Sequence, residues 1–142
     1  MSKIIDNIEL FRDLDNETRL QLIFDYSQKL PPLPEMYRNR EQRNTHRVPE
    51  CQTPVSLWVD VSNDKVHIYA DVPRESPTVR GFISLLIDSF EDVSINEVEN
   101  APTDILQQTG LDSALGMLRI QGLSSIYKRI KDQVHQKILS TQ

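Results

Sequence analysis

The fold is decided by residues 55–71, which read VSLWVDVSNDKVHIYAD. Apolar residues occupy every second position from Val55 to Val61 and again from Val66 to Ala70. This alternation predicts two half-buried strands, and the polar triplet Ser62-Asn63-Asp64 predicts a tight turn between them. We therefore expect an antiparallel hairpin, with residues 45–48 as a short third strand. The residues expected on the polar face of the first strand are Ser56, Trp58 and Asp60.

Helical spacing appears before the hairpin. One apolar set predicts a first helix, and Asp15-Asn16 provides a cap for a second helix. Leu30-Pro-Pro-Leu-Pro34 ends that helix, because consecutive prolines remove backbone donors, and a polar loop follows from Glu35 to about Asn44. The two apolar sets are Ile4, Ile5, Ile8 and Phe11, then Leu20, Ile23, Phe24 and Leu30.

Further helices follow the hairpin. Ser76-Pro77 combines a capping residue with proline at the first helical position, so a helix with a buried stripe is expected up to Phe90. Ser94 and Glu97 have the spacing of a capping box, and residues 103–108 form another short helical candidate that Gly110 would end. Apolar residues at spacings of three and four between Leu123 and Ile138 predict a long amphipathic helix.

Strands in the middle of the chain and helices on both sides indicate an α+β fold. We expect a small antiparallel sheet of about three strands, covered by N-terminal, middle and C-terminal helices. A chain of 142 residues fits a single domain spanning residues 1–142.

The composition limits the classes of partner that we expect. The net charge is −5, from 16 basic and 21 acidic residues, which argues against nucleic acid or an anionic membrane as the main partner. No apolar run approaches the roughly 18 residues that span a bilayer. Acidic residues within the first apolar stretch are unlike a secretory signal or a transit peptide. We expect a cytoplasmic protein whose thiol stays reduced.

Cys51 is the only cysteine, and it lies where a polar loop gives way to the first strand. It can form no internal disulfide, and no second cysteine is available for a zinc site or a redox pair. The thiol is either a free nucleophile or an inert core residue. Its neighbours Pro49, Glu50, Gln52 and Pro54 are not core-filling residues, so the sequence leaves both readings open.

Basic side chains precede the thiol. Positive neighbours lower the pKa of a thiol and raise its thiolate fraction, whereas Glu50 acts in the opposite direction if it lies close. The alternative is a solvated loop without electrostatic effect. The three histidines, His46, His67 and His135, have no metal-ligand spacing, and surface roles are expected for them. The basic set comprises Arg38, Arg40, Arg43, His46 and Arg47.

Five segments, in this order and spacing, resemble the SufE family of sulfur-acceptor proteins. The likeness extends from about residue 14 to residue 131, and the segments around the cysteine and before the last helix are its most specific parts. The segments are Leu30-Pro-Pro-Leu-Pro34, Val48-Pro49-x-Cys51-Gln52-x-x-Val55-x-x-Trp58, Ala70-Asp71, Val79-Arg80-Gly81-Phe82 and Arg119-x-Gln-Gly122-Leu123.

The resemblance implies a SufE/IscU-like α+β fold and a defined role for Cys51. The cysteine would take sulfur, as a persulfide, from a SufS-like cysteine desulfurase that uses pyridoxal phosphate. The chain would stimulate that enzyme and deliver sulfur to a SufBCD-like iron–sulfur scaffold. It would bind no cofactor or metal itself, act as an accessory protein more than as an enzyme, and exist as a monomer or homodimer.

The resemblance also assigns site residues. Cys51 matches the acceptor cysteine, Arg119 matches an arginine of the cysteine region and the desulfurase contact, and Gly122 matches the start of the last helix. The remaining predicted partner contacts are Arg47, Glu50 and Gln52. Glu50 stands where the family usually has glycine. Without the resemblance, Arg119 would be a surface charge and Gly122 a close helix contact.

Two other functions stay open. The chain could be a non-catalytic interaction domain whose cysteine is structural, in which case the thiol would resist alkylation. It could also relay sulfur to another pathway, such as tRNA thiolation, which only a transfer assay or a pull-down separates from cluster assembly.

Overall fold

The hairpin forms as predicted. The computed structural model describes residues 2–140, so residues 1, 141 and 142 of the expected single domain lie outside the described part. Strands β1 (Ser56–Ser62) and β2 (Lys65–Asp71) pair antiparallel. Asn63 and Asp64 turn the chain with φ of +53° and +62°, and this pair of left-handed residues matches the right-handed twist of a hairpin.

The sheet has two strands, where about three were expected. Arg47 forms one isolated antiparallel bridge with Ser56, and the backbone N–H of Leu57 donates to the carbonyl of His46 over 3.0 Å. Thr45 still belongs to helix α3 (Arg40–Thr45), so little extended chain is left to pair. The third strand is therefore reduced to a single bridge.

The N-terminal helical hairpin is confirmed. Ser2 caps α1 (Lys3–Arg12), and the Asp15 carboxylate accepts from the Thr18 N–H over 2.8 Å to cap α2 (Asn16–Ser27). The apolar stripe of α2 was predicted too broadly. Ile23 is buried, but Leu20 and Phe24 are 39% and 49% exposed, and Ile5 of α1 is 39% exposed.

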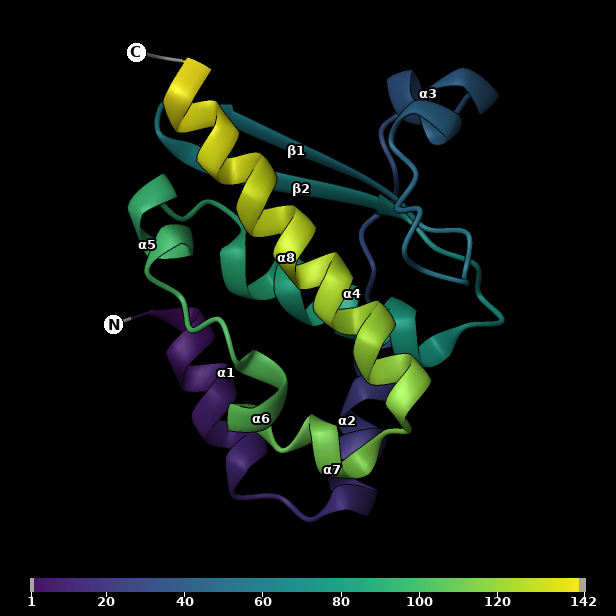
Figure 1. The fold of residues 1–142 in the computed structure, drawn as a ribbon, viewed down its shortest axis with the longest axis vertical. Helices are drawn as coiled ribbons and strands as arrows, with labels where there is room; N and C mark the ends of the chain where they lie inside the picture. Colours follow the sequence, from purple (N-terminus) through teal and green to yellow (C-terminus); the bar gives the residue numbers. More distant parts are fainter. Residues whose placement is uncertain (1, 141–142) are drawn as a thin grey trace.

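Helix α4 (Pro77–Phe90) is the centre of the core, as the Ser76-Pro77 signal predicted. Figure 1 shows it between α8 and the N-terminal helices. A Cβ built on Gly81 would lie 2.0 Å from the carbonyl oxygen of Ile23, so glycine permits α2 and α4 to cross at backbone contact. The guanidinium of Arg80 fastens the same crossing by donating to the carbonyls of Ser27, at 3.0 Å, and Val72, at 2.6 Å.

The polar segment predicted as a loop contains a 3-10 turn, η1 (Glu35–Tyr37), and the short helix α3. These cover the face of β1 that was expected to be polar. Tyr37 stacks on Trp58 with ring centroids 4.9 Å apart, and the Trp58 indole donates to the Gln42 side chain over 3.1 Å. Trp58 is only 3% exposed, so the prediction that it lies on an exposed face was wrong.

Three short helices lead to the long last helix, α8 (Met117–Ser140), which crosses in front of the sheet and α4 in Figure 1. Gly110 ends α6 in the left-handed conformation, with φ of +78°. Tyr127 and Lys131 of α8 donate to the carbonyls of Pro102 and Ala101, both over 2.5 Å, which fixes α8 on the preceding segment. The short helices are α5 (Ile95–Glu99), α6 (Ile105–Thr109) and α7 (Leu111–Ala114).

The architecture is α+β, with helices packed around a small antiparallel sheet, as expected. None of the helices in residues 2–140 is long and apolar enough to cross a membrane.

Candidate functional site

Cys51 lies in a loop that is closed at its base. The N–H of Val48 donates to the carbonyl of Val55 over 2.9 Å, and the Cys51 N–H donates back to the Val48 carbonyl over 3.3 Å. Val48 and Val55 are fully buried and anchor the two ends. Pro49, Glu50, Gln52 and Pro54 are exposed around the thiol.

The Cys51 side chain points inward and is 7% exposed. It lies beside the start of α8, where a Cβ built on Gly122 would lie 3.7 Å from Sγ. That distance is ordinary van der Waals contact, so no tight helix packing requires glycine here. The expectation that Gly122 serves a close helix contact is not met, and its missing side chain leaves space beside the sulfur.

A cavity of about 380 Å³ opens next to the thiol. Three segments meet around it: the cysteine loop, the approach to α4 with its first turn, and the first turns of α8. Its charged side chains are Glu50, Glu75 and Arg119, and no histidine is among the described residues that line it. The lining residues are Glu50, Cys51, Gln52, Thr53, Glu75, Ser76, Pro77, Thr78, Val79, Leu118, Arg119, Gln121 and Gly122.

Arg119 is positioned across the cavity from the cysteine loop. Its Nη1 donates to the Thr78 hydroxyl over 3.1 Å, which ties the start of α8 to the first turn of α4. The residue is exposed, as are its neighbours Met117 and Leu118, at 71% and 70%. A cation and an apolar side chain, Arg119 and Leu118, therefore face solvent in the lining of the thiol cavity, with Met117 exposed next to them in the sequence.

Glu50 lies between the thiol cavity and the outer side of α8. Lys128 of α8 forms a 2.7 Å ion pair with Asp132, which raises the pKa of Lys128, and the charge of Glu50 adds a smaller effect in the same direction. Glu50 and Lys128 also line a second hollow, on the outer side of α8.

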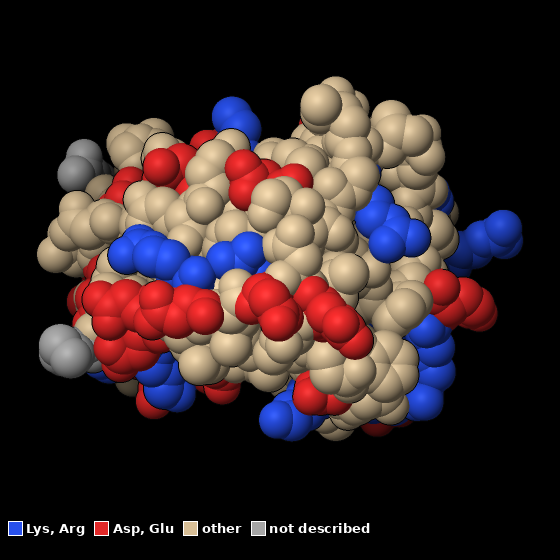
Figure 2. All heavy atoms as spheres, turned by 90° about the horizontal axis from the view of Figure 1, so that it is seen from below, with Lys and Arg blue, Asp and Glu red and all other residues tan. Residues whose placement is uncertain are grey.

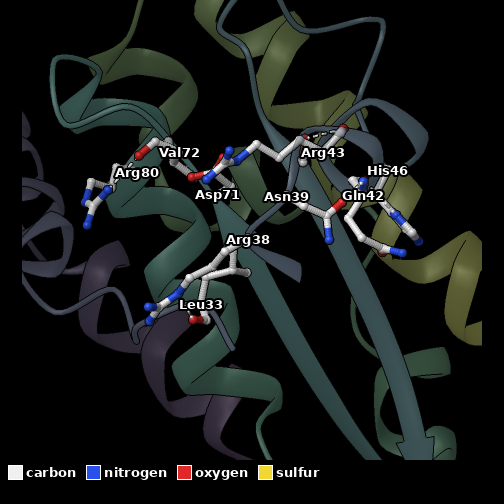
Figure 3. A network of polar contacts seen from close by, with 10 residues as sticks. Leu33, Arg38, Asn39, Gln42, Arg43, His46, Asp71, Val72 and Arg80 are labelled. Carbon is white, nitrogen blue, oxygen red and sulfur yellow. Dashed lines mark hydrogen bonds and ion pairs between the residues drawn. The ribbon is translucent and has the colours of Figure 1, made fainter. Parts of the chain in front are cut away.

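The basic segment upstream of the cysteine does not line the thiol cavity. Figure 3 shows where its side chains go: Arg43 pairs with Asp71 at 2.7 Å, and Arg38 donates to the carbonyl of Leu33. Arg47 borders a separate surface hollow with Arg43 and Pro54. None of these arginines lines the thiol cavity, which agrees with the alternative of a solvated loop.

Of the predicted site residues, the fold brings Cys51, Glu50, Gln52, Arg119 and Gly122 together and leaves Arg47 on another hollow. Sequence reasoning missed Thr78 as the partner of Arg119, and nothing in the sequence links positions 41 residues apart. Two histidines instead have acidic partners, His67 with Glu91 and His135 with Glu99. The described residues contain no group of three His, Cys, Asp or Glu side chains that could hold a metal ion.

This arrangement suits group transfer more than hydrolysis. A cysteine hydrolase requires a base within reach of the thiol and donors for an oxyanion, and the cavity provides no histidine for the first task. A thiol that only accepts a small group requires access, space and a docking surface.

Comparison with known proteins agrees with this arrangement. The family model for SufE, described as an Fe-S metabolism associated domain, matches residues 2–134. An "uncharacterized SufE-like protein" of Mycobacterium tuberculosis is 30% identical over 127 residues, which cover 89% of this chain and 87% of that protein. A SufE-like protein of Rhizobium meliloti is 27% identical and is matched over 96% of its length by 97% of this chain.

The fold has a solved counterpart. The solution structure of a hypothetical protein from Thermus thermophilus superposes with a TM-score of 0.82 and is 34% identical, with 98% of this chain and 99% of that chain covered. The family match spans nearly the whole chain and includes the cysteine loop and Arg119. The chain therefore belongs to the SufE family and to iron–sulfur metabolism.

Proposed function

We propose that this protein is a sulfur acceptor in which Cys51 takes the outer sulfur of a persulfide from a cysteine desulfurase. The observation that carries the proposal is the space beside Cys51 Sγ: a Cβ built on Gly122 would lie 3.7 Å from the sulfur, and glycine leaves that position empty. A persulfide adds one sulfur atom about 2.0 Å from Sγ. Membership of the SufE family supports a general role in sulfur transfer.

The chemical step resembles thiol–disulfide exchange. The Cys51 thiolate attacks the outer sulfur of the desulfurase persulfide, so a new S–S bond forms on Cys51. The S–S bond on the desulfurase breaks, and its cysteine leaves as a thiolate. One persulfide is lost and one is formed, so the step needs no oxidant or reductant. The proton of the Cys51 thiol ends on the released cysteine.

The surface around the cavity supports a protein partner. Arg119 presents a fixed cation beside exposed Met117 and Leu118, which together fit an apolar patch with an acidic rim. Figure 2 shows the lower face of the molecule with acidic and basic side chains interspersed, without one continuous basic surface for a phosphate backbone. The desulfurase would carry the pyridoxal phosphate, and this chain would need no cofactor of its own.

In the full proposal, docking stimulates the desulfurase, and Cys51 then passes its sulfur to an iron–sulfur scaffold in the cytoplasm. Residues 1–142 would form one functional domain. Because Cys51 is 7% exposed, the loop must open or the partner must enter the cavity before the thiol reacts. The hydrogen bond between Val48 and Val55 would hold the two ends of the loop together while the segment between them opens.

The proposal is tested by incubating the protein with a cysteine desulfurase and labelled cysteine, then measuring the intact mass. We expect one added sulfur on the wild-type chain, none on Cys51→Ser, and loss of stimulation in that variant. Arg119→Ala should reduce the stimulation while leaving the fold intact, and the matched exposed variant Arg40→Ala should not. Equal stimulation by Cys51→Ser would instead favour an interaction domain with a structural cysteine.

A further inference from the structure

Glu50 is the only charged residue of the cysteine loop, residues 49–54. The base of the loop is fixed, because the N–H of Val48 donates to the carbonyl of Val55 over 2.9 Å. Nothing comparable ties the loop itself to α8, since no hydrogen bond between the two occurs within residues 2–140. Two neighbouring side chains remain to hold the loop in place, the buried Cys51 and the exposed Glu50.

Cys51 and Glu50 lie over two places on the same helix. A Cβ built on Gly122 would lie 3.7 Å from Cys51 Sγ, and Glu50 lines a hollow of about 480 Å³ together with Lys128. Gly122 and Lys128 are six residues apart, which is about 9 Å along the axis of α8. Consecutive Cα atoms are only about 3.8 Å apart, so a carboxylate held toward Lys128 keeps the adjacent thiol against the start of α8.

The charges around Glu50 favour α8. The other charged side chains that line the thiol cavity are one acid and one base, whose effects oppose each other. Those that line the outer hollow are two bases and one acid, all on α8. The excess positive charge around the Glu50 carboxylate therefore comes from α8. The side chains are Glu75 and Arg119 on the thiol side, and Lys128, Arg129 and Asp132 on the outer side.

The attraction between Glu50 and α8 acts without direct contact. Lys128 forms its 2.7 Å ion pair with Asp132, which raises the pKa of Lys128 most, and the charge of Glu50 raises it further. Among the described residues, the Glu50 carboxylate has no hydrogen bond or ion pair of its own. Exposed charges that do not touch attract weakly, and the screening length falls from about 10 Å at 0.1 M salt to about 3 Å at 1 M. Such a hold yields easily and weakens with salt.

We propose that Glu50 is a positioning residue for Cys51, because its attraction to Lys128 and Arg129 holds the cysteine loop against α8 and keeps the thiol covered. The closed position belongs to the free chain, and its consequence for sulfur uptake rests on the proposed function. The thiol of the free protein is then reached slowly by small reagents, and its exposure increases when the charges on either side are removed or screened.

The test measures alkylation of Cys51 by iodoacetamide, a neutral reagent, in the free full-length chain, followed by intact mass. Rates are compared at their alkaline plateau, where the thiol is fully ionised, so that a change in thiolate fraction is not mistaken for opening. Lys128 keeps its charge there, because its hydrogen bond with Asp132 raises its pKa above the ordinary 10.5. Rates of the same variants unfolded in urea correct for intrinsic reactivity.

We expect Glu50→Gln to react at least about twofold faster than the wild-type protein in 0.1 M salt. Raising the salt to 1 M should accelerate the wild-type reaction similarly and leave Glu50→Gln unchanged. Glu75→Gln is the matched control, because it removes one acid from the lining of the thiol cavity but not from the outer hollow. Its rate should stay within about 1.5-fold of the wild-type rate, since only a screened charge away from the outer hollow is lost.

A charge exchange separates attraction from structural damage. Glu50→Lys and Lys128→Glu each place like charges on the two sides, and each alone should accelerate alkylation at least about threefold. The double variant restores opposite charges and should return to within about twofold of the wild-type rate, which a damaged loop or helix would not do. Circular dichroism of the three variants checks that α8 is retained.

The proposal would be overturned if Glu50→Gln reacted at the wild-type rate in 0.1 M salt. It would also be overturned if the effects of Glu50→Lys and Lys128→Glu simply multiplied in the double variant, since the loop would then be held by contact alone. The measurement contains no desulfurase, so either result would leave sulfur transfer unaffected. Failure of Cys51 to gain sulfur from a desulfurase would instead contradict the proposed function and not the closed position of the loop.

Discussion

Two glycines mark two helix contacts of opposite character. At Gly81, where α4 crosses α2, an added Cβ would lie 2.0 Å from the Ile23 carbonyl oxygen. At Gly122, where α8 meets the cysteine loop, an added Cβ would lie 3.7 Å from Cys51 Sγ, which is ordinary contact. The first glycine is a steric requirement of the fold. The second keeps space open beside a thiol.

The α2–α4 crossing and the contact of the cysteine loop with α8 also differ in their hydrogen bonds. Arg80 of α4 donates to the carbonyl of Ser27, at the end of α2, and to that of Val72, which follows β2, so it ties α4 to both segments. Within residues 2–140, no hydrogen bond joins residues 49–54 to α8. The core crossing is thus held by hydrogen bonds, while the cysteine loop lies on α8 without one, through van der Waals contact and the attraction between Glu50 and Lys128. We therefore expect the loop to separate from α8 more easily than α2 separates from α4.

The largest expected effect is that of Gly81→Ala. The new methyl group would collide with backbone atoms that cannot rotate away, so we expect a loss of at least about 3 kcal/mol of unfolding free energy or an insoluble protein. Urea denaturation measures the loss. Gly116→Ala is the matched control, because nothing lies within 4 Å of an added Cβ there. If the two variants were about equally stable, Gly81 would not be a steric requirement of the fold.

Arg80→Met should have the next largest effect. It retains the apolar stem but leaves the carbonyls of Ser27 and Val72 without their donor, which predicts a loss of about 2 kcal/mol. The exposed Arg40→Met serves as the control in the same denaturation experiment. A loss below about 0.5 kcal/mol, the usual effect of a surface substitution, would mean that Arg80 does not fasten the crossing.

Tyr127→Phe tests whether α8 is a fixed surface for the loop. The variant loses the hydrogen bond to Pro102, which predicts about 1 kcal/mol of destabilisation at neutral pH. Burial, and to a lesser degree Asp104, raises the pKa of Tyr127 above its ordinary value of 10.0. The folded state then holds the proton more tightly, so stability falls as the pH rises above about 10. The variant should show a shallower alkaline loss, and an unchanged profile would contradict this role.

Gly122→Ala should have the smallest effect on stability and a selective effect on function. Alanine favours a helix over glycine by up to about 1 kcal/mol, and the site tolerates the methyl group, so the unfolding free energy should stay equal or rise. The space beside Sγ becomes smaller, and sulfur transfer to Cys51 should slow several-fold. Normal transfer in a fully folded variant would show that this space is not needed.

Much of the fold follows from local pattern. The period-two runs and Asn63-Asp64 predicted the hairpin, and Ser76-Pro77 predicted the start of α4, because each signal depends only on neighbouring residues. The sequence did not predict that η1 and α3 cover one face of β1. Helix α3 has six residues and η1 has three, which is too short for a periodic signal, so Trp58 was assigned to an exposed face.

The site was only partly predictable. The resemblance identified Cys51, Arg119 and Gly122, and the fold brings them to one cavity. Their contacts depend on how α8 lies over the loop, and no local pattern encodes that. The same limit applies to Thr78 beside Arg119. The sequence left open whether the basic segment lies beside the thiol, and in the structure Arg43 instead pairs with Asp71 at the end of β2.

The most direct test of the account is the rate of alkylation of Cys51, with and without a cysteine desulfurase, followed by intact mass. A single cysteine makes the readout unambiguous. We predict slow modification of the free protein and a rate at least about tenfold higher with the desulfurase, equivalent to about 1.4 kcal/mol less opening free energy. A thiol that stays unmodified in both conditions, while the unfolded chain reacts fully, would contradict it.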